Sequence, residues 1–479
     1  MARTSSGTRS IILLAVSAGS DCAMAQFVEP EVRVIHTFAG AAGTQLGWAV
    51  SGMRDIDGDG VMELIIPSPG ATANRGRVDV FSGASGALIP HLSLLGSVNN
   101  GRFGHAIADA GDVNNDGKVD LIVGSPAPAG TEGRVLVFSG LDGSLIRSRN
   151  GDVIGNQFGY AVAGVGDLNN DNRGDYIVGA PGPTGVPVER GRVYVFSGLD
   201  GSVIRFHDGE AAGDVLGMGV SGVGDLNGDG VPEYAAAAPR GGPGRRGRAY
   251  VWSGSTGQLL LPVMDAQATG GSFGDFFVGS AGDVDHDGKP DLYIGDYTDS
   301  RAYVFSGRDG HRVHSLQQNS TEGLGCGRGA GDVNGDRRDD LVVGAYASSA
   351  GASQAGRVYV YSGHDGSILR TITSARSGEQ FGFDAVGVGD VDGDGRLDFL
   401  VGAASGNRTY VIAGVHQVCY ANCDSGTIAP TLNVADFVCF LNRFAAGDLY
   451  ANCDDSTSTP LLNVNDFICY LNAFSLGCS

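Results

Sequence analysis

The sequence predicts an all-β fold, a seven-bladed β-propeller, followed by a small disulfide-rich module of loops and helices. Two observations predict the propeller. Four short β-type segments without helical periodicity recur along the repeats, the last of which stops after its third. Each of the seven repeats carries an Asp-rich signature, with first aspartates at Asp55, Asp112, Asp167, Asp225, Asp283, Asp332 and Asp390. Repeats of this spacing and content are typical of propeller blades. A third observation, six cysteines between positions 419 and 478, indicates a separate disulfide-linked unit.

Composition agrees with this fold class and excludes others. The chain has 80 Gly and 16 Pro among 479 residues, which excludes a long helical bundle, and its 42% of hydrophobic residues argues against wholesale disorder. Asp and Glu number 53 against 32 Lys and Arg, a formal net charge of −21. Phosphate would repel so acidic a chain, so we expect no nucleic-acid partner and favour bound cations.

Residues 1–25 read as a secretory signal peptide. Arg3 and Arg9 precede a short apolar run, Ile11 to Ala18, and Ala23-Met24-Ala25 matches a cleavage site before Gln26. No later apolar run is long enough to cross a bilayer, so we expect no transmembrane segment and a secreted protein, with cell-surface association as an option. The predicted domains are the signal peptide at 1–25, the propeller at 26–416 and the C-terminal module at 417–479.

The second repeat shows the four predicted strands in order. The small-residue segment after Phe103-Gly104 is expected nearest the propeller axis, where blades crowd. Asp120 to Gly124 (DLIVG) reads as a short buried strand, and Arg134 to Ser139 (RVLVFS) alternates in polarity. The hairpin turn GLDG then leads into a fourth strand that starts at Ser144 to Arg147.

The two ends of the repeat region predict a closed ring. Repeat seven stops after its third strand, Thr409 to Ala413, whereas Val32 to His36 precedes the first repeat in the place of a fourth strand. We therefore expect the N-terminal strand to complete the last blade, which removes exposed sheet edges. An open solenoid or two smaller sandwiches is the alternative.

Each repeat carries the pattern Asp-x-[Asp/Asn]-x-Asp-[Gly]-x-x-[Asp/Glu] between its first two strands. Side-chain oxygens at positions 1, 3, 5 and 9, with a backbone carbonyl at position 7, are the hard ligands that Ca²⁺ prefers, and no His or Cys takes part. Seven Ca²⁺ would bring the formal charge from −21 to −7. Seven Asp-Gly or Asn-Gly turns with incidental charge are the alternative. The candidate metal ligands are Asp55, Asp57, Asp59, Glu63, Asp112, Asn114, Asp116, Asp120, Asp167, Asn169, Asp171, Asp175, Asp225, Asn227, Asp229, Glu233, Asp283, Asp285, Asp287, Asp291, Asp332, Asn334, Asp336, Asp340, Asp390, Asp392, Asp394 and Asp398.

We expect these metal sites to be structural and unequal. Position 6 needs a turn conformation that suits Gly, but repeat three has Asn172 there and repeat six has Arg337. A left-handed Arg costs on the order of 1 kcal/mol. The site that begins at Asp332 is therefore expected to be the weakest or to stay empty.

The repeats resemble the FG-GAP repeats of the integrin alpha-chain propeller over about residues 32–414. Phe-Gly begins four repeats, Leu-Gly begins three, and Gly179-Ala180-Pro181 matches the GAP element. The resemblance implies that the calcium loops lie on one face and that the loops joining strands two and three lie on the other. Those loops vary in length, as binding loops on a rigid scaffold do. They include residues 67–76, 181–191, 239–247 and 346–356, and repeat five has almost none (296–301).

No catalytic motif stands out. H-E-x-x-H and phosphate-binding loops are absent from the sequence, and the nine His residues do not recur in register with a nucleophile or carboxylate. Cys326, the unpaired cysteine of the propeller, is expected to be a buried small residue. We therefore predict no catalytic residue and no cofactor besides Ca²⁺.

The region 419–479 contains a second duplication. Each half reads as a polar loop followed by a helix, Val434 to Ala445 and Val464 to Phe474, and the apolar side chains of the first helix, Phe437, Phe440, Leu441 and Phe444, are expected on one helical face. The module resembles the paired loop–helix repeats of dockerin modules, which implies calcium binding and a docking partner. The usual Asp-x-Asn-x-Asp-Gly opening is reduced here to Asn-x-Asp, so calcium binding by this module stays open.

Six cysteines allow 15 different sets of disulfide pairs, and one set is symmetric with respect to the duplication. Equivalent positions in the two halves favour Cys423–Cys439, Cys453–Cys469 and Cys419–Cys478. A disulfide-linked cap without any partner is the alternative to a docking module.

The leading functional hypothesis is a secreted, calcium-binding protein without catalytic activity. It would recognise or adhere to an extracellular protein or glycan through the propeller loop face and carry a docking or sorting tail. The alternatives are an extracellular polysaccharide- or lipid-processing enzyme that uses the same face, and a structural component of a cell-surface coat.

Overall fold

The computed structural model describes residues 26–126, 131–182, 190–267, 272–414 and 434–446, with Phe467, Tyr470 and Leu471. The chain forms two compact units, a larger one that holds the repeats up to Gly414 and a smaller C-terminal one. The predicted signal peptide lies outside the described residues. No helix in the described ranges is long and apolar enough to cross a membrane.

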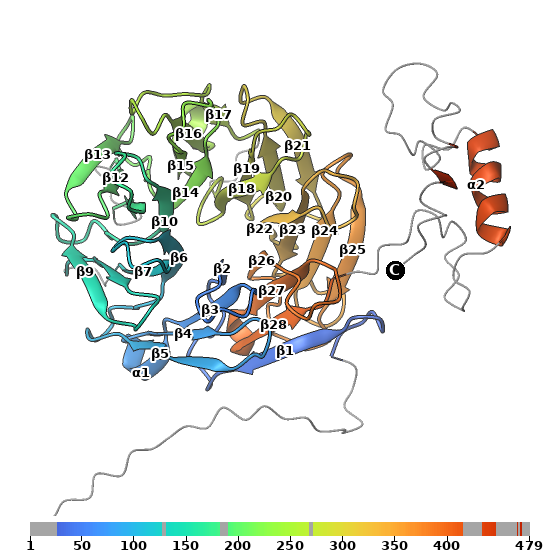
Figure 1. Cartoon of the computed structure of the whole chain (residues 1–479), viewed down its shortest axis with the longest axis horizontal. Coiled ribbons are helices and arrows are strands. Elements are labelled where there is room, and N and C mark those ends of the chain that lie inside the picture. Colours follow the sequence, from blue (N-terminus) through green and yellow to red (C-terminus); the bar gives the residue numbers. More distant parts are fainter. Residues whose placement is uncertain are drawn as a thin grey trace, which may run out of the picture. The chain divides into compact units, whose positions relative to one another are not determined.

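The repeats form a ring of blades around a central axis (Figure 1). Among the described residues there are seven four-stranded antiparallel sheets, and six of them use four strands consecutive in the chain. From inner to outer strand, these six blades are β2 (Ser51–Met53), β3 (Glu63–Ser68), β4 (Arg77–Phe81) and β5 (Leu88–Leu95); β6 (Ala106–Gly111), β7 (Asp120–Ser125), β8 (Arg134–Phe138) and β9 (Leu145–Asn150); β10 (Val162–Gly166), β11 (Asp175–Ala180), β12 (Arg192–Phe196) and β13 (Val203–Asp208); β14 (Gly219–Gly224), β15 (Glu233–Ala238), β16 (Arg248–Trp252) and β17 (Met264–Asp265); β18 (Val278–Gly282), β19 (Asp291–Asp296), β20 (Arg301–Phe305) and β21 (Arg312–Gln317); β22 (Leu324–Gly331), β23 (Asp340–Ala345), β24 (Arg357–Tyr361) and β25 (Ile368–Thr373).

The seventh blade joins the two ends of the repeat region. It consists of β26 (Asp384–Gly389), β27 (Asp398–Ala403), β28 (Arg408–Ile412) and β1 (Val34–Ala39), and β1 pairs antiparallel with β28. The predicted closure is confirmed, although β1 begins at Val34 rather than at Val32. Because β1 supplies the missing fourth strand, the ring is closed, and neither an open solenoid nor a pair of sandwiches describes the fold.

The inner strands are rich in small residues because neighbouring blades meet there. A Cβ atom on Gly164 of β10 would lie 2.5 Å from the carbonyl oxygen of Asp109, and one on Gly222 of β14 would lie 2.4 Å from that of Gly164. Real Cβ atoms do not approach this closely, so only glycine fits where the backbones converge. The expectation that the glycine-rich strand lies nearest the axis is confirmed.

Buried side chains fill the space between blades. The second strand of each blade is buried along its whole length, as in β7 and β11. Phe38 of β1 is 6% exposed and contacts Phe81 of β4 with ring centroids 4.4 Å apart, so the closing strand also packs against the first blade. The short helices α1 (Ala71–Asn74), η1 (Pro243–Arg245) and η2 (Ala404–Gly406) lie in loops between second and third strands.

A repeated side-chain hydrogen bond links each blade to the next, and we call it the blade clasp. A His or Arg on the outer strand donates to a backbone carbonyl just after the third strand of the following blade. His91 Nε2 lies 3.0 Å from the Gly140 oxygen, and Arg147 Nε lies 2.9 Å from the Gly198 oxygen. Among the described residues, six of the seven blade junctions have a clasp; the other four donors are His36, Arg205, His314 and Arg370.

The described part of the C-terminal unit contains the helix α2 (Val434–Ala446), which confirms the first predicted helix. Phe440 stacks on Tyr470 with ring centroids 3.9 Å apart, and Phe437 contacts Phe467 at 5.9 Å. Each pair joins residues at the same position of the duplicated sequence, so the two halves pack through equivalent aromatic side chains. Phe440 is fully buried, whereas Leu441 is 39% exposed and lies at the edge of the predicted apolar face.

The second predicted helix lies mostly outside the described residues, although Phe467, Tyr470 and Leu471 are helical. Cys439 is disulfide-bonded, and its partner lies outside the described residues. The pairing of Cys423 with Cys439 therefore stays a prediction.

Ring closure gives a stability prediction. Substituting Phe38→Ala should lower the free energy of unfolding by about 3–5 kcal/mol, because the change leaves a cavity between the seventh and first blades. Phe206→Ala on the outer strand β13 is the matched control. Its side chain is 53% exposed, so the loss should stay below about 1 kcal/mol. Guanidinium unfolding followed by circular dichroism measures both, and equal losses would contradict a tightly packed closure.

Candidate metal sites in the acidic loops

Each acidic loop connects the inner strand of a blade to its second strand. The first loop runs from β2 to β3 and the second from β6 to β7, and the same connection recurs around the ring. Because the strands of a blade are antiparallel, these loops share one end of the blades, and the loops between second and third strands share the other. The sequence-based placement of the loops is confirmed.

The carboxylates at positions 1 and 5 wind each loop into the same turn. In the second loop, Asp112 Oδ2 accepts the Gly117 N–H at 2.9 Å, and Asp116 Oδ1 accepts the Lys118 N–H at 2.9 Å. Position 6 has the positive φ that the sequence predicted. The φ values are 85° at Gly60, 86° at Gly117, 63° at Asn172, 84° at Gly230, 85° at Gly288, 70° at Arg337 and 83° at Gly395.

The acid at position 9 starts the second strand and is fully buried in all seven repeats. In the second repeat its two oxygens hold two different parts of the blade. Asp120 Oδ2 accepts the Val113 N–H of its own loop at 2.8 Å, while Asp120 Oδ1 accepts the Gly140 N–H at 3.1 Å. The seven fully buried acids are Glu63, Asp120, Asp175, Glu233, Asp291, Asp340 and Asp398.

The turn glycine that meets this acid is required by space. A Cβ atom on Gly140 would lie 1.9 Å from the Val119 carbonyl oxygen. The serine before it also takes part, because Ser139 Oγ donates to Asp116 Oδ2 at 3.2 Å. Sequence reasoning did not assign this Ser-Gly pair a role, although its recurrence after the third strand of all but the last repeat was the available signal.

Burial raises the pKa of the position-9 carboxyls. It raises the pKa of Asp120, Asp175 and Asp398 to about 6 and that of Asp291 to about 7, against the opposing effect of the N–H donors. The same cause raises the pKa of Glu63 and Glu233. The ionised carboxylates are therefore under-stabilised by the protein alone, and a nearby cation would supply the missing interaction.

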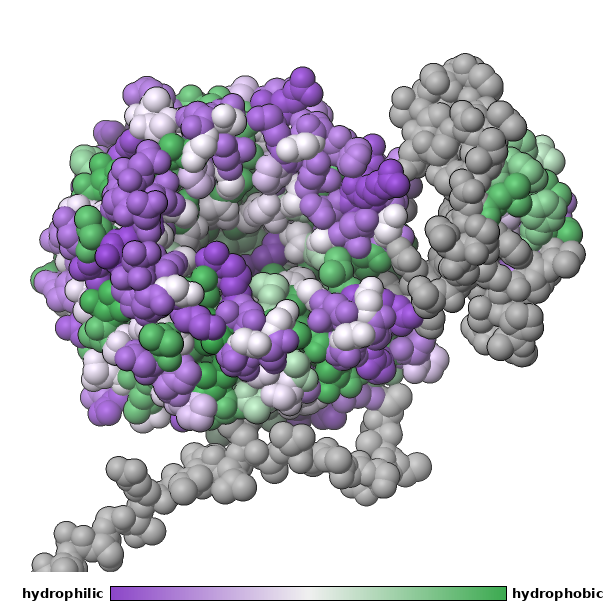
Figure 2. Space-filling model, in the orientation of Figure 1, coloured by the Kyte–Doolittle hydropathy of each residue, from purple (hydrophilic) through white to green (hydrophobic). Residues whose placement is uncertain are grey.

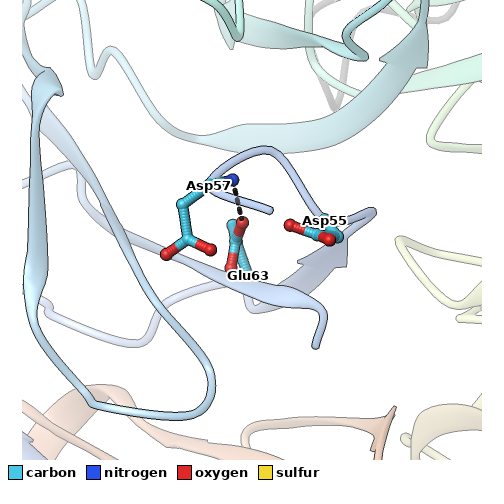
Figure 3. A group of neighbouring side chains, drawn as sticks. All are labelled: Asp55, Asp57 and Glu63. Carbon is cyan, nitrogen blue, oxygen red and sulfur yellow. Dashed lines mark hydrogen bonds between the residues drawn. The ribbon is translucent and has the colours of Figure 1, made fainter. Parts of the chain in front are cut away.

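The first loop brings three carboxylates together around an oxygen that lacks a partner. Oxygens of Asp55, Asp57 and Glu63 all lie within 4.8 Å of one another, and Figure 3 shows the Glu63 carboxylate between the two aspartates. Glu63 Oε1 accepts the Ile56 and Asp57 N–H groups at 2.8 and 3.1 Å. Glu63 Oε2 is buried and has no hydrogen-bond partner among the described residues. Such a donor set, all oxygen with one orphaned buried atom, fits a hard divalent cation.

The fifth and seventh loops gather carboxylates in the same way. The groups are Asp283 with Asp285 and Asp291, and Asp390 with Asp392 and Asp398. These three loops are the ones with Asp at position 3. The other four repeats have a neutral amide oxygen there, from Asn114, Asn169, Asn227 and Asn334, so the carboxylate count per loop differs around the ring.

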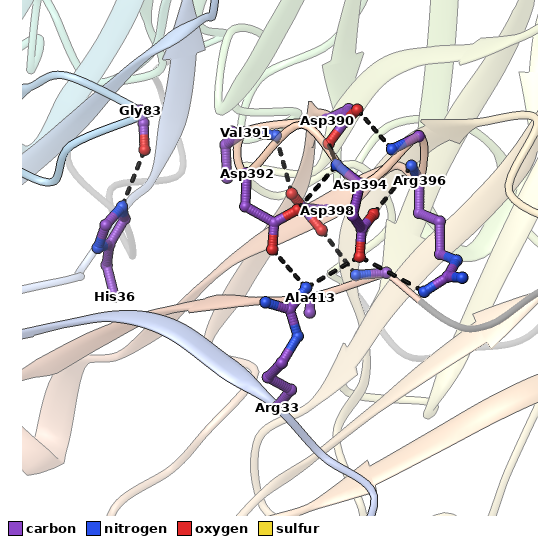
Figure 4. A network of polar contacts seen from close by, with 12 residues as sticks. Arg33, His36, Gly83, Asp390, Val391, Asp392, Asp394, Arg396, Asp398 and Ala413 are labelled. Carbon is purple, nitrogen blue, oxygen red and sulfur yellow. Dashed lines mark hydrogen bonds and ion pairs between the residues drawn. The ribbon is translucent and has the colours of Figure 1, made fainter.

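Arg33 contacts the seventh loop, which sequence reasoning missed. Its guanidinium pairs with Asp392 and lies 3.0 Å from Asp394 Oδ2, as Figure 4 shows. Arg33 directly precedes β1, so ring closure brings it to carboxylates at the opposite end of the repeat region. No local pattern in the sequence could have indicated this ion pair. It places a side-chain cation beside two of the proposed metal ligands.

Cys326 is a buried small residue of β22, as expected. It is 2% exposed, and burial raises the pKa of its thiol well above the ordinary value. A thiol with a raised pKa is a poor nucleophile at neutral pH.

Comparisons with known proteins identify the repeats. The FG-GAP repeat family matches residues 46–81, 105–138 and 158–196, and the FG-GAP-like repeat family matches residues 225–294, 283–343 and 332–401. The chain is also similar to integrin alpha chains. It is 32% identical to integrin alpha-8 of Gallus gallus over 231 residues, 45% of this chain and 22% of that protein. It is 32% identical to integrin alpha-IIb of Homo sapiens over 275 residues, 51% of this chain and 26% of that protein. The matches thus span about a quarter of the length of these relatives.

The orphaned oxygen of Glu63 gives a test of cation binding. Glu63→Gln should stabilise the protein in chelator by roughly 1 kcal/mol, because the new amide N–H can pair with neighbouring carboxylates. In excess Ca²⁺ the same variant should be less stable than wild type, because it lacks one charged ligand. Chemical unfolding with and without chelator measures both signs.

Glu233→Gln is the matched control for Glu63→Gln. Both Glu233 oxygens already accept hydrogen bonds, from Leu226 N–H at 2.7 Å and from the Asn227 amide at 2.8 Å. An amide N–H there would face another donor, so we expect no stabilisation in chelator. If Glu63→Gln also fails to stabilise the metal-free protein, the missing hydrogen bond of Glu63 Oε2 does not destabilise the fold.

The raised pKa values predict proton release on cation binding. In metal-free protein, carboxyls with pKa values of about 6 to 7 are partly protonated at pH 6. Because these pKa values exceed those of the unfolded chain, the groups favour folding below about pH 4, and that contribution is lost as pH rises through 6 to 7. Ca²⁺ should therefore release protons at pH 6 and almost none at pH 8. Calorimetric titrations in buffers of different ionisation enthalpy measure the release; equal values at both pH values would contradict a ligand role for these acids.

Proposed function

We propose that this chain, whose propeller is built from FG-GAP repeats, is a secreted, calcium-stabilised recognition protein without catalytic activity. It binds an extracellular protein or glycan through the loops opposite the acidic loops. The observation that carries the proposal is the division of the ring into two faces. One face repeats a single charged turn seven times, whereas the other presents loops that differ from blade to blade.

Calcium is the proposed cation because of the ligand chemistry. The loops offer only oxygen donors, from carboxylates, an amide in four repeats and the backbone. Ca²⁺ accepts six to eight such ligands in flexible geometry, whereas Mg²⁺ prefers strict octahedral coordination and keeps several waters. Residues at positions 1, 3, 5 and 9 would hold the ion, and the loop that starts at Asp332 stays the proposed weakest site.

The proposed role of calcium is structural. The position-9 acid binds the Gly140 N–H, and the Gly140 carbonyl accepts the clasp from His91 of the preceding blade. A cation that fixes Asp120 would thereby fix the junction between two blades. In the seventh loop, Ca²⁺ would compete with Arg33 for Asp392 and Asp394.

The proposed binding loops are ordered by contacts to the scaffold. Arg245 Nη2 donates to the Gly213 carbonyl at 2.6 Å, which anchors the 239–247 loop to the preceding connection. The 346–356 loop closes on itself through the Gly356 N–H and the Ser348 carbonyl at 2.9 Å. Blade five has only residues 297–300 between its second and third strands, so the loop face carries no long loop at this blade.

The C-terminal module is proposed as a docking tail. The duplication leaves an equivalent apolar residue exposed on each half, Leu441 at 39% and Leu471 at 40%. These two leucines are the proposed contacts to the docking partner.

A loop exchange within the chain tests recognition. The full-length protein in Ca²⁺ is immobilised and exposed to the extracellular and envelope fractions of the producing organism. Captured partners should be lost when residues 346–356 are replaced by the short 297–300 connection of blade five, and retained when Asp285→Asn weakens one acidic loop. Capture that survives shortening of this loop and of the 239–247 loop would contradict binding through this face.

A further inference from the structure

A cavity lies on the axis of the propeller. It has a volume of about 510 Å³ and is lined by the inner strands of all seven blades, by residues just before them, and by Tyr297 and Tyr346, which follow second strands. Figure 2 shows the hollow at the centre of the ring. A volume of several hundred cubic ångströms is usual for pockets that hold small organic ligands, so this cavity has room for a ligand of one or two sugar rings.

One charged pair lies inside this cavity. Arg328 of β22 donates to Asp384 Oδ1 at 2.6 Å, and Asp384 Oδ2 accepts the Val50 N–H at 2.9 Å. Asp384 is 4% exposed, whereas the Arg328 side chain is 32% exposed and lines the cavity. Arg328 Nε is buried and has no hydrogen-bond partner in the described part of the chain. Nε itself is enclosed, so a ligand oxygen would reach the accessible part of the guanidinium that lines the cavity.

Aromatic rings meet at the end of the cavity where the inner strands begin. Trp48 of the first blade contacts Phe383 of the seventh at 5.0 Å and Phe276 of the fifth at 6.2 Å. Because Trp48 and Phe276 come from blades that are not neighbours, the rings meet across the axis. They offer apolar faces beside the polar pair, and Ser51, Ser221 and Ser280 add hydroxyl oxygens to the lining.

Charge selects against anionic ligands. The other end of the channel leads into the acidic loops, and the chain has a net charge of −21, so an anion is repelled on approach. Inside, Arg328 and Asp384 neutralise each other, and Asp109 is paired with Arg54 at 3.0 Å. Burial and the charge of Arg102 lower the pKa of His105 to about 3, so its ring is neutral at physiological pH. The cavity therefore suits a ligand without negative charge that has several hydroxyl groups and an apolar face.

We propose that the axial cavity binds a neutral saccharide of one or two rings. Its hydroxyl oxygens accept from the Arg328 guanidinium, and one sugar face lies against the aromatic rings around Trp48. Tyr297 and Tyr346, from connections between second and third strands, also line the cavity, but Arg328 and Trp48 lie outside those connections.

The chain offers a built-in reporter for this site. It contains two tryptophans, Trp48 in the cavity lining and Trp252, which is 7% exposed in the fourth blade. In full-length Trp252→Phe protein with Ca²⁺, the emission of Trp48 should change on titration with at least one of maltose, cellobiose and lactose, with dissociation constants in the millimolar range or tighter. Calorimetry on the wild-type chain confirms binding. No response to any of the three sugars in either measurement overturns the proposal.

Two variants locate the binding, and one pair of probes tests the charge argument. Arg328→Met combined with Asp384→Asn removes both charges together and should weaken binding of the sugar at least ten-fold. Ala163→Leu, which fills the cavity without touching the pair, should do the same and serves if the double variant does not fold. Arg134→Met on the outer rim is the control and should leave affinity unchanged. Sugar binding retained by a folded cavity variant overturns the proposal, as does glucuronate binding as tightly as glucose.

Discussion

A single buried carboxylate in each repeat holds the propeller together. In the second blade, Asp120 accepts one N–H from its own acidic loop and another from the turn glycine Gly140. The carbonyl of that glycine accepts the clasp from His91 of the preceding blade. Loop, blade and blade junction are therefore fixed through one side chain. The cost of burying its charge is the cost that the proposed cation would offset.

This arrangement assigns different tasks to the two faces. The sequence of the acidic-loop face can vary little, because a Cβ on Gly140 would collide with Val119 and position 6 needs a positive φ. Its sequence repeats for that reason. The opposite face carries no such joint in the described ranges, so its loops vary from the short connection of blade five to the anchored 239–247 loop. A scaffold fixed on one face can vary the other without loss of stability.

The sequence alone was sufficient for the features that recur locally. Seven repeats predicted seven blades, the alternation of β8 was visible in RVLVFS, and the missing fourth strand of repeat seven predicted closure by the N-terminus. Features that depend on distant residues were not visible. The Arg33 contact with the seventh loop, the blade clasps and the Arg328–Asp384 pair all join different repeats or opposite ends of the repeat region. The two residues of each contact become neighbours only once the blades assemble into a ring, so no local pattern in the sequence predicts the contact.

Closure of the ring by its first strand also constrains the order of folding. Val34 pairs with Ile412, so nearly the whole propeller must be synthesised before the seventh blade has all its strands. Until then β1 has no partner strand, and the final pairing must close the longest loop that the propeller contains. A nascent or truncated chain therefore keeps an open sheet edge that other chains can pair with, and the last step of folding is also the step that protects the protein from aggregation.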